Sequence, residues 1–287
     1  MSNNTLALEN RLEEIEGLPT LPLVLRQIQK VMNNERTSMT QIAAVVAKDQ
    51  ALTSRAIRLV NSAWYGRTTR VTSIQQVLVT LGLKALNSLM LGLTITKMFG
   101  SSNGCGFDGK AFWEHSFGTA LLARKLAKEL KSGCDAEECF IAGLLHDMGR
   151  LVLEQYFHDD FMATMKRMRE TGQSLLTAEK NIFGFSHTDA GAWLGRKWNI
   201  PQGLTLAMEF HHTSVVPLDL HPNEKHTVNI VSAANELCLA GNIGSSGEHA
   251  PSTVASHFRN GWSAELCTRL VNETRQEVTA TIQQWSA

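Results

Sequence analysis

The chain has 287 residues, of which 43% are hydrophobic, so it can bury the core of one large domain or of two ordinary ones. Its 27 Lys and Arg residues balance 27 Asp and Glu residues. A formal net charge of zero without a dense basic block argues against a nucleic-acid-binding surface, and we expect no nucleic-acid partner.

The first hundred residues carry start and stop signals of short helices. Ser38-Met-Thr-Gln41 and Ser73-Ile-Gln-Gln76 each fit a capping box, and Gly82 is placed as a C-terminal stop. Asp49 is placed to cap a helix over residues 50–62. An apolar stripe recurs along that helix, formed by Leu52, Ala56, Leu59 and Val60.

The clearest break in the chain is the turn-rich segment 100–109, and all ten histidines lie beyond it. In this second region Ser186-His-Thr-Asp189 predicts one helix start, and Pro201 predicts the first turn of the next helix. Segment 241–251 is typical of a loop before a terminal helix pair. No run alternates apolar and polar residues for long enough to predict a strand.

We therefore expect an all-α fold. A smaller bundle of short helices should occupy residues 1–100 as an N-terminal subdomain, and a larger helical domain should occupy residues 110–287. The cysteines are five in number and scattered, without a C-x-x-C pair, which predicts reduced thiols rather than a disulfide framework; they are Cys105, Cys134, Cys139, Cys238 and Cys267. The first three lack the spacing of metal ligands and are expected to serve packing.

The N-terminal sequence lacks the basic and apolar regions of a signal peptide. The most apolar stretch, residues 85–99, contains polar side chains and is too short to cross a bilayer. We expect a soluble cytoplasmic protein without a membrane partner. No receiver, GGDEF or DNA-binding segment is visible, so we expect any such domain to lie on another chain.

The pair His146-Asp147 ends an apolar helical run, where core packing alone does not require two ionisable side chains. Burying such a pair is costly unless each member has a partner, and a metal ion would satisfy both. Adjacent helical residues diverge by about 100°. The pair can therefore serve one site only from a helix end, and Gly149 is placed to supply that end.

Further candidate ligands stand beside apolar residues on expected helices. His187 shares a helix face with Gly191, where the missing side chain lets another group approach. His211 follows Leu204 and Ala207 at helical spacing and so faces the core. The complete candidate set is His115, His146, Asp147, His187, His211 and His212.

Imidazole and carboxylate ligands without thiolates suit iron, manganese, zinc or nickel. Six ligands exceed the need of one tetrahedral zinc ion, so we expect one or two divalent ions, and two could activate water beside a phosphoryl group. Each histidine alone also fits a hydrogen-bonded core residue. Surface or structural roles are expected for the other five, which are His158, His221, His226, His249 and His257.

Several stretches resemble the HDOD family, a family linked to signalling and regulation. They are Leu18-Pro-Thr-Leu-Pro22, residues 49–62, residues 143–149, residues 187–194 and Trp198-Asn-Ile-Pro201. The resemblance runs from about residue 15 to residue 240 and implies an HD-like helical bundle preceded by short helices, together one HDOD module.

The second region also resembles the HD superfamily of metal-dependent phosphohydrolases, to which HDOD proteins are related. The superfamily pattern is His, then His-Asp, then a distant Asp. Here it is matched by His115 and His146-Asp147, with Asn235 at the last position. Asn is a neutral and poorer ligand for a hard cation.

The HD-GYP relatives, which hydrolyse cyclic di-GMP, carry a Lys three residues after the Asp of the pair, where this chain has Arg150. They follow a double His with Glu and a Gly-Tyr-Pro motif. In this chain His211-His212 precedes residues 213–217, Thr-Ser-Val-Val-Pro, and the motif is absent. An Arg binds phosphate oxygens with a different geometry from Lys. These departures argue against cyclic di-GMP hydrolysis.

The resemblance implies a non-catalytic regulatory or signalling module with a vestigial or retained metal site. Such a module would bind a protein partner of a signalling pathway or a small ligand such as a nucleotide. The alternative is a metal-dependent phosphohydrolase acting on a nucleotide or phosphodiester, with Asp147 and Arg150 as catalytic residues. For both functions the expected metal site consists of the six candidate ligands and, as a seventh position, Asn235.

Overall fold

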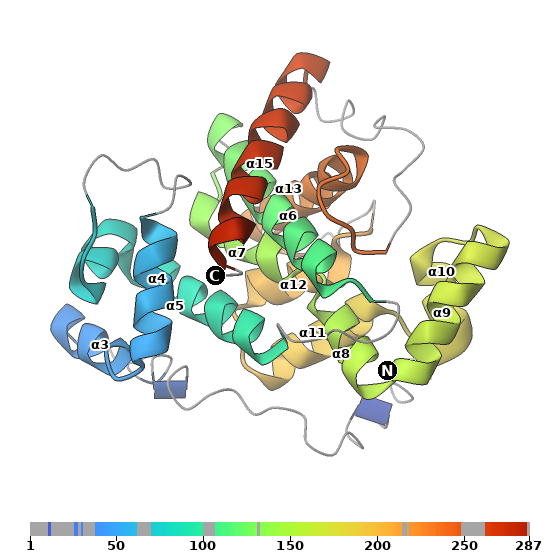
Figure 1. Cartoon of the computed structure of the whole chain (residues 1–287), viewed down its shortest axis with the longest axis horizontal. Helices are drawn as coiled ribbons and strands as arrows, with labels where there is room; N and C mark the ends of the chain where they lie inside the picture. Colours follow the sequence, from blue (N-terminus) through green and yellow to red (C-terminus); the bar gives the residue numbers. More distant parts are fainter. Residues whose placement is uncertain are drawn as a thin grey trace. The chain divides into compact units, whose positions relative to one another are not determined.

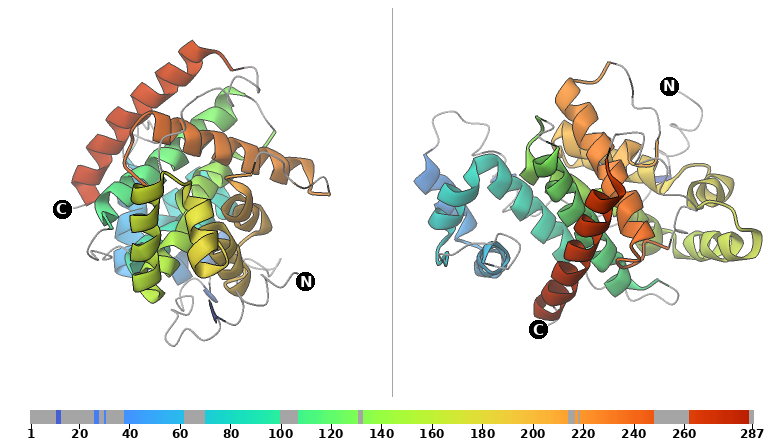
Figure 2. Two further views of the ribbon diagram at one scale, coloured as in Figure 1. Left: turned by 90° about the vertical axis from the view of Figure 1, so that its right-hand side faces the viewer. Right: turned by 90° about the horizontal axis from the view of Figure 1, so that it is seen from above.

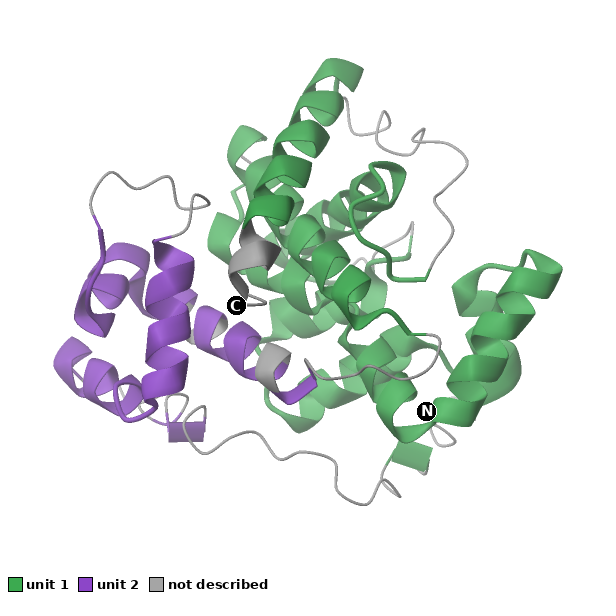
Figure 3. Cartoon of the chain, viewed as in Figure 1, with its two compact units in different colours: residues 1–18, 102–287 green, residues 19–101 purple. Residues whose placement is uncertain are grey.

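A computed structural model of the chain describes residues 11–12, 26–27, 30, 38–61, 70–99, 107–130, 133–213, 217, 219–247 and 262–285. The secondary structure in these ranges is helical and includes no strand, which confirms the all-α prediction (Figures 1 and 2). Two compact units divide the chain, residues 19–101 and residues 1–18 with 102–287 (Figure 3). The motif at 18–22 lies outside the described ranges.

In the unit of residues 19–101 the structure describes α3 (Met39–Val46), α4 (Gln50–Val60) and α5 (Ile74–Phe99). Ser38 and Gln41 form the predicted capping box, and the Asp49 side chain accepts a hydrogen bond from the backbone N–H of Leu52. The predicted α4 stripe is buried, and α3 and α4 both pack on α5. Capping and burial together define this small core.

Helix α5 contains a break at Gly82, whose φ of 77° and ψ of 173° lie outside the helical region. The predicted stop is at the right residue, but the helix resumes directly beyond it and Gly82 acts as a kink. Only one of the two hydrogen bonds of the predicted capping box before α5 is present. Ser73 accepts a hydrogen bond from the backbone of Gln76, whereas the Gln76 side chain accepts from Thr72.

In the other unit helix α6 (Gly109–Glu129) is the central element. It packs against α7, α13 and α15 (Figure 1). Lys125 fastens α15 to it through ion pairs of 2.8 Å to Glu273 and 2.9 Å to Glu277. The remaining helices of this unit are α7 (Ala136–Leu145), α8 (Met148–Tyr156), α9 (His158–Thr171), α10 (Leu175–Phe183), α11 (His187–Lys197), α12 (Gln202–Phe210), α13 (Pro222–Ala240) and α15 (Ala264–Trp285).

Helices α9 and α10 form a hairpin at the edge of this unit (Figure 2). Gly172 ends α9 with a φ of 67°, in the left-handed region that glycine tolerates best, and Ser174 caps α10. Met168, Leu175 and Ala178 form a small core between the two helices. The hairpin leaves from the end of α8 and returns the chain to the start of α11.

The predicted helix starts after α10 are close to those observed. Ser186 and Asp189 form a capping box, and α11 begins at His187. Pro201 is the residue before α12 rather than part of its first turn. The loop predicted at 241–251 is described as far as residue 247, directly after α13. Among the described helices, none has both the length and the apolar character needed to cross a membrane.

His146 and Asp147 form the junction between α7 and α8, because α7 ends at Leu145 and α8 begins at Met148. The expected helix end is therefore present, but the expectation that Gly149 supplies it is wrong. Gly149 lies in the first turn of α8, where a Cβ atom would come within 1.8 Å of the backbone oxygen of His187. Its role is to let α8 and α11 cross closely.

Candidate metal centre

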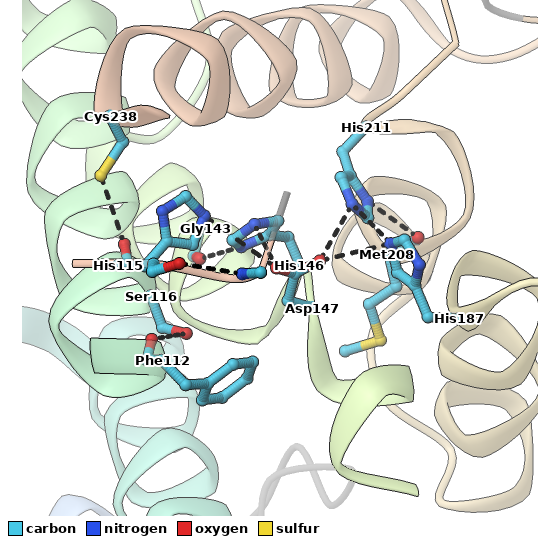
Figure 4. A network of polar contacts seen from close by, with 12 residues as sticks. Phe112, His115, Ser116, Gly143, His146, Asp147, His187, Met208, His211 and Cys238 are labelled. Atoms are coloured by element: carbon cyan, nitrogen blue, oxygen red, sulfur yellow. Dashed lines mark hydrogen bonds and ion pairs between the residues drawn. The ribbon is translucent and has the colours of Figure 1, made fainter. Parts of the chain in front are cut away.

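Five helices bring the candidate ligands to one place in the core (Figure 4). His115 comes from α6, His146 and Asp147 from the α7–α8 junction, His187 from the first position of α11, and His211 and His212 from the end of α12. Each of these side chains is at most 1% exposed, except His212, which is partly exposed. Residues distant in the sequence thus share one buried cluster.

One half of the cluster surrounds Oδ1 of Asp147. This oxygen lies 3.4 Å from Nε2 of His187 and 3.3 Å from Nε2 of His211, and the two nitrogens lie 3.4 Å apart. These three atoms form a nearly equilateral triangle. The centre of such a triangle lies at the side length divided by √3, here about 2 Å from each atom, and this is the length of a metal–nitrogen or metal–oxygen bond. His212 belongs to the same group, whose ligand atoms lie within 4.8 Å of one another.

The other half surrounds Oδ2 of Asp147. Nε2 of His146 lies 3.4 Å from this oxygen, and Nε2 of His115 lies 4.0 Å from it. Figure 4 shows these two rings on one side of Asp147, with His187 and His211 on the other. Each carboxylate oxygen therefore faces its own set of histidines, an arrangement suited to a carboxylate that bridges two ions.

Backbone carbonyls orient two of the rings. Nδ1 of His146 lies 2.7 Å from the carbonyl oxygen of Gly143, and Nδ1 of His211 lies 3.0 Å from that of Met208. A carbonyl only accepts, so each Nδ1 donates, and each ring turns its Nε2 atom toward Asp147. The Asp147 oxygens accept no hydrogen bond from the described residues. A cation would draw the Asp147 carboxylate and the Nε2 lone pair of the neutral His211 ring to one point, so the residues fit a metal.

A carboxylate that sequence analysis missed orients His187. One oxygen of Glu179, in α10, accepts hydrogen bonds from Nδ1 of His187 at 2.7 Å and from its backbone N–H at 2.9 Å. Glu179 is completely buried. A signal was present in the sequence, because Leu175, Glu179 and Phe183 are spaced by four and place the acid on an apolar helix face.

The electrostatics of the cluster favour ligand-competent forms of Asp147 and His211. Burial opposes ionisation of Asp147, but His146, His187 and His211 outweigh it and hold the pKa of the carboxyl well below its usual range. Burial, with a contribution from His212, lowers the pKa of His211 to about 3, so this ring is neutral. Burial opposes the charged form of His187 too, but Glu179 and Asp147 raise its pKa to about 10.

The sequence model of the HDOD domain family matches residues 18–214, which is more than half of the chain. The chain belongs to the HDOD family. This result confirms the resemblance found in the sequence motifs. It covers all candidate ligands of the metal centre except Asn235.

This HDOD protein is similar to a curated sequence and to solved structures, and the solved structures share its fold. An uncharacterised protein of Treponema pallidum (strain Nichols) is 25% identical over 248 residues, 86% of this chain and 47% of the relative, so the chain spans about half of that protein. The structure of an HDOD domain protein of unknown function from Geobacter sulfurreducens has a TM-score of 0.78, with 23% identity over 97% of each chain. A candidate phosphohydrolase from Shewanella amazonensis SB2B has a TM-score of 0.71, with 24% identity over 95% of this chain and 96% of its own.

Two further predicted site residues of the HDOD protein are buried. Asn235 lies in α13, and its side-chain oxygen accepts no hydrogen bond from the described residues. Arg150 lies in α8 and is 0% exposed. Its guanidinium group contacts Phe161 and the sulfur of Met165, while its Nε and one terminal nitrogen donate no hydrogen bond to a described residue. No signal in the sequence predicts that this Arg is enclosed.

Three of the remaining histidines are described, and none of them is part of the cluster. His158 is within 3.6 Å of Glu154, His221 caps α13 through its side chain, and His226 is exposed. His249 and His257 lie outside the described residues.

Replacing Glu179 by Gln should weaken metal binding by about 10- to 100-fold, because an amide holds the His187 ring less firmly and makes it less basic. Chelator competition measures the dissociation constant. The exposed Glu170 of α9 offers a matched control, since Glu170→Gln removes the same charge far from any candidate ligand. Equal affinity in Glu179→Gln and wild type would show that Glu179 only fills space.

Proposed function

We propose that this HDOD protein is a metal-binding regulatory module. Its helical scaffold binds a protein partner or a small ligand, and its ions fix the helices in place without turning over a substrate. The observation that carries the proposal is the buried Asp147 carboxylate, each of whose oxygens faces a separate set of imidazole nitrogens. A bound divalent ion would supply positive charge that crosslinks α6, α11 and α12 to the α7–α8 junction.

Burial and ligand type both favour a regulatory role over a catalytic one. A catalytic metal site keeps a coordination position open to water and substrate. Here His115, His146, His187 and His211 are all at most 1% exposed. Asn235 stands where the superfamily pattern has an acid, which reduces the negative charge available to hold an activating ion.

Metal analysis of protein purified without chelator tests the proposal. We expect bound divalent metal and a melting temperature that rises on addition of manganese or iron. A metal-free protein whose melting temperature does not respond would contradict the metal centre. Hydrolysis of bis-p-nitrophenyl phosphate and cyclic dinucleotides should not exceed that of the His146→Ala variant. Turnover that disappears in that variant would contradict the non-catalytic role.

One observation favours a second candidate, a metal-dependent phosphohydrolase. Arg150 and Asp147 are three residues apart, so they lie on the same face at the start of α8. No described acidic side chain lies within ion-pair distance of the buried Arg150 guanidinium, and burying an unpaired charge is costly. Phosphoryl oxygens of a substrate would supply the missing negative charge.

If the protein is a phosphohydrolase, Arg150→Met should lower kcat/KM by about 10²- to 10³-fold without changing metal content, because one transition-state donor is lost. Arg167→Met, at an exposed position of α9, is the matched control. Hydrolysis of bis-p-nitrophenyl phosphate measures kcat/KM for each variant. An active wild type whose rate is unaffected by Arg150→Met would exclude Arg150 from the reaction.

A further inference from the structure

Two cysteines meet at the start of α7. Asp135 is the N-cap of this helix, so Cys134 precedes the cap and Cys139 is the fourth helical residue. Side chains at these two positions commonly contact each other across the cap, as in a hydrophobic staple. Here the contact joins two sulfur atoms that are 3.3 Å apart. The local fold of the helix start therefore holds two thiols together.

The two thiols differ in exposure. Cys134 is partly exposed, whereas Cys139 is 0% exposed. Contact with Cys134, and then burial, raise the pKa of Cys139 far above its usual range, so this thiol keeps its proton. An oxidant from solvent therefore reacts first with Cys134, and the protonated thiol of Cys139 lies in contact with it.

We propose that Cys134 and Cys139 are an oxidation site that forms a reversible intrachain disulfide when the protein meets a peroxide. The Cys134 sulfur attacks one peroxide oxygen, the O–O bond breaks, and one molecule of water leaves as Cys134 becomes a sulfenic acid. The Cys139 sulfur then attacks the Cys134 sulfur. The S–O bond breaks, the hydroxide takes the Cys139 proton, and a second molecule of water leaves. Two thiols are oxidised by two electrons, and one peroxide is reduced.

The geometry needs little change for this reaction. A disulfide bond is about 2.05 Å long, so the sulfurs must approach by little more than 1 Å. Cys134 lies outside the helix, next to Gly133 with a φ of 77°, and can move without breaking an α7 hydrogen bond. The disulfide would close a ring over the first turn of α7, the helix that ends at Leu145. The site is chemically independent of the metal centre.

Mass spectrometry of the full chain treated with hydrogen peroxide tests the proposal. Trypsin releases both cysteines in one peptide, residues 132–150, because no Lys or Arg lies between them. We expect this peptide to become lighter by about 2 Da, to resist alkylation, and to regain two alkylatable thiols after dithiothreitol.

Cys134→Ser and Cys139→Ser should each abolish the 2 Da loss, and Cys267→Ser should retain it. Cys134→Ser changes a partly exposed side chain, so it serves as the informative variant if Cys139→Ser does not fold. Two alkylatable thiols after peroxide treatment would overturn the proposal, and so would a peptide that only gains oxygen at sulfur. Metal content plays no part in this readout, so it stands or falls separately from the proposed function.

Discussion

Replacing Asp147 by Asn should weaken metal binding by more than about 100-fold and leave little metal bound per chain, a larger loss than the 10- to 100-fold that a substitution beyond the ligands causes. The substitution removes the charge that both halves of the centre share. It also points an amide N–H₂ group at imidazole nitrogens that lie 3.3–3.4 Å from the present oxygens. A donor facing these acceptors can replace the missing cation, so the fold should survive. Metal analysis and circular dichroism of the same sample measure the two effects.

Asp147 is well suited to this experiment because its side chain makes no capping hydrogen bond to α8. Loss of metal is therefore not confused with loss of a helix cap. Asp159→Asn makes the same change at an exposed position in the first turn of α9 and should leave metal content unaltered. Equal metal in Asp147→Asn and wild type would refute a shared carboxylate ligand.

Replacing Gly149 by Ala should destabilise the protein by about 3 kcal/mol, at the upper end of the usual cost of overpacking. The added Cβ would meet the His187 backbone oxygen at 1.8 Å and the backbone nitrogen of Gly191 at 2.7 Å. Backbone atoms cannot rotate away as a side chain can, so α8 and α11 must separate. Chemical denaturation, followed by circular dichroism, gives the change in unfolding free energy.

Gly191 provides the matched control from the opposite side of the same crossing. A Cβ there would lie 3.4 Å from its nearest neighbours, an ordinary van der Waals contact. Gly191→Ala should therefore change stability by no more than about 1 kcal/mol, with the higher helix propensity of Ala compensating for the contact. A loss of no more than about 1 kcal/mol in Gly149→Ala as well would contradict the close backbone contact between α8 and α11.

Local signals in the sequence were enough to predict the fold class. Ser38, Asp49 and Ser186 each stand where a helix begins, because a capping side chain acts on amides two or three residues away. Gly82 shows the limit of such signals. Its left-handed backbone was predictable, but whether the chain continues as a helix beyond it depends on packing along the whole of α5.

The candidate site was predictable in its residues but not in its geometry. Spacing placed His187 and His211 on core-facing sides of their helices, and the structure brings both to Asp147. Glu179 was missed because its contact with His187 joins two helices through a turn whose path the sequence does not determine. Likewise, only the fold reveals that Gly149 accommodates a carbonyl oxygen of another helix.

The two halves of the centre are completed at different times during synthesis. His115, His146 and Asp147 are made within the first half of the chain or close to it, whereas His211 and His212 follow about 100 residues after His115. The half that can form early is the looser one, with a separation of 4.0 Å between His115 and Asp147. A nascent chain therefore presents an incomplete donor set until α12 has left the ribosome, and tight capture of an ion by this centre would be a late event of folding.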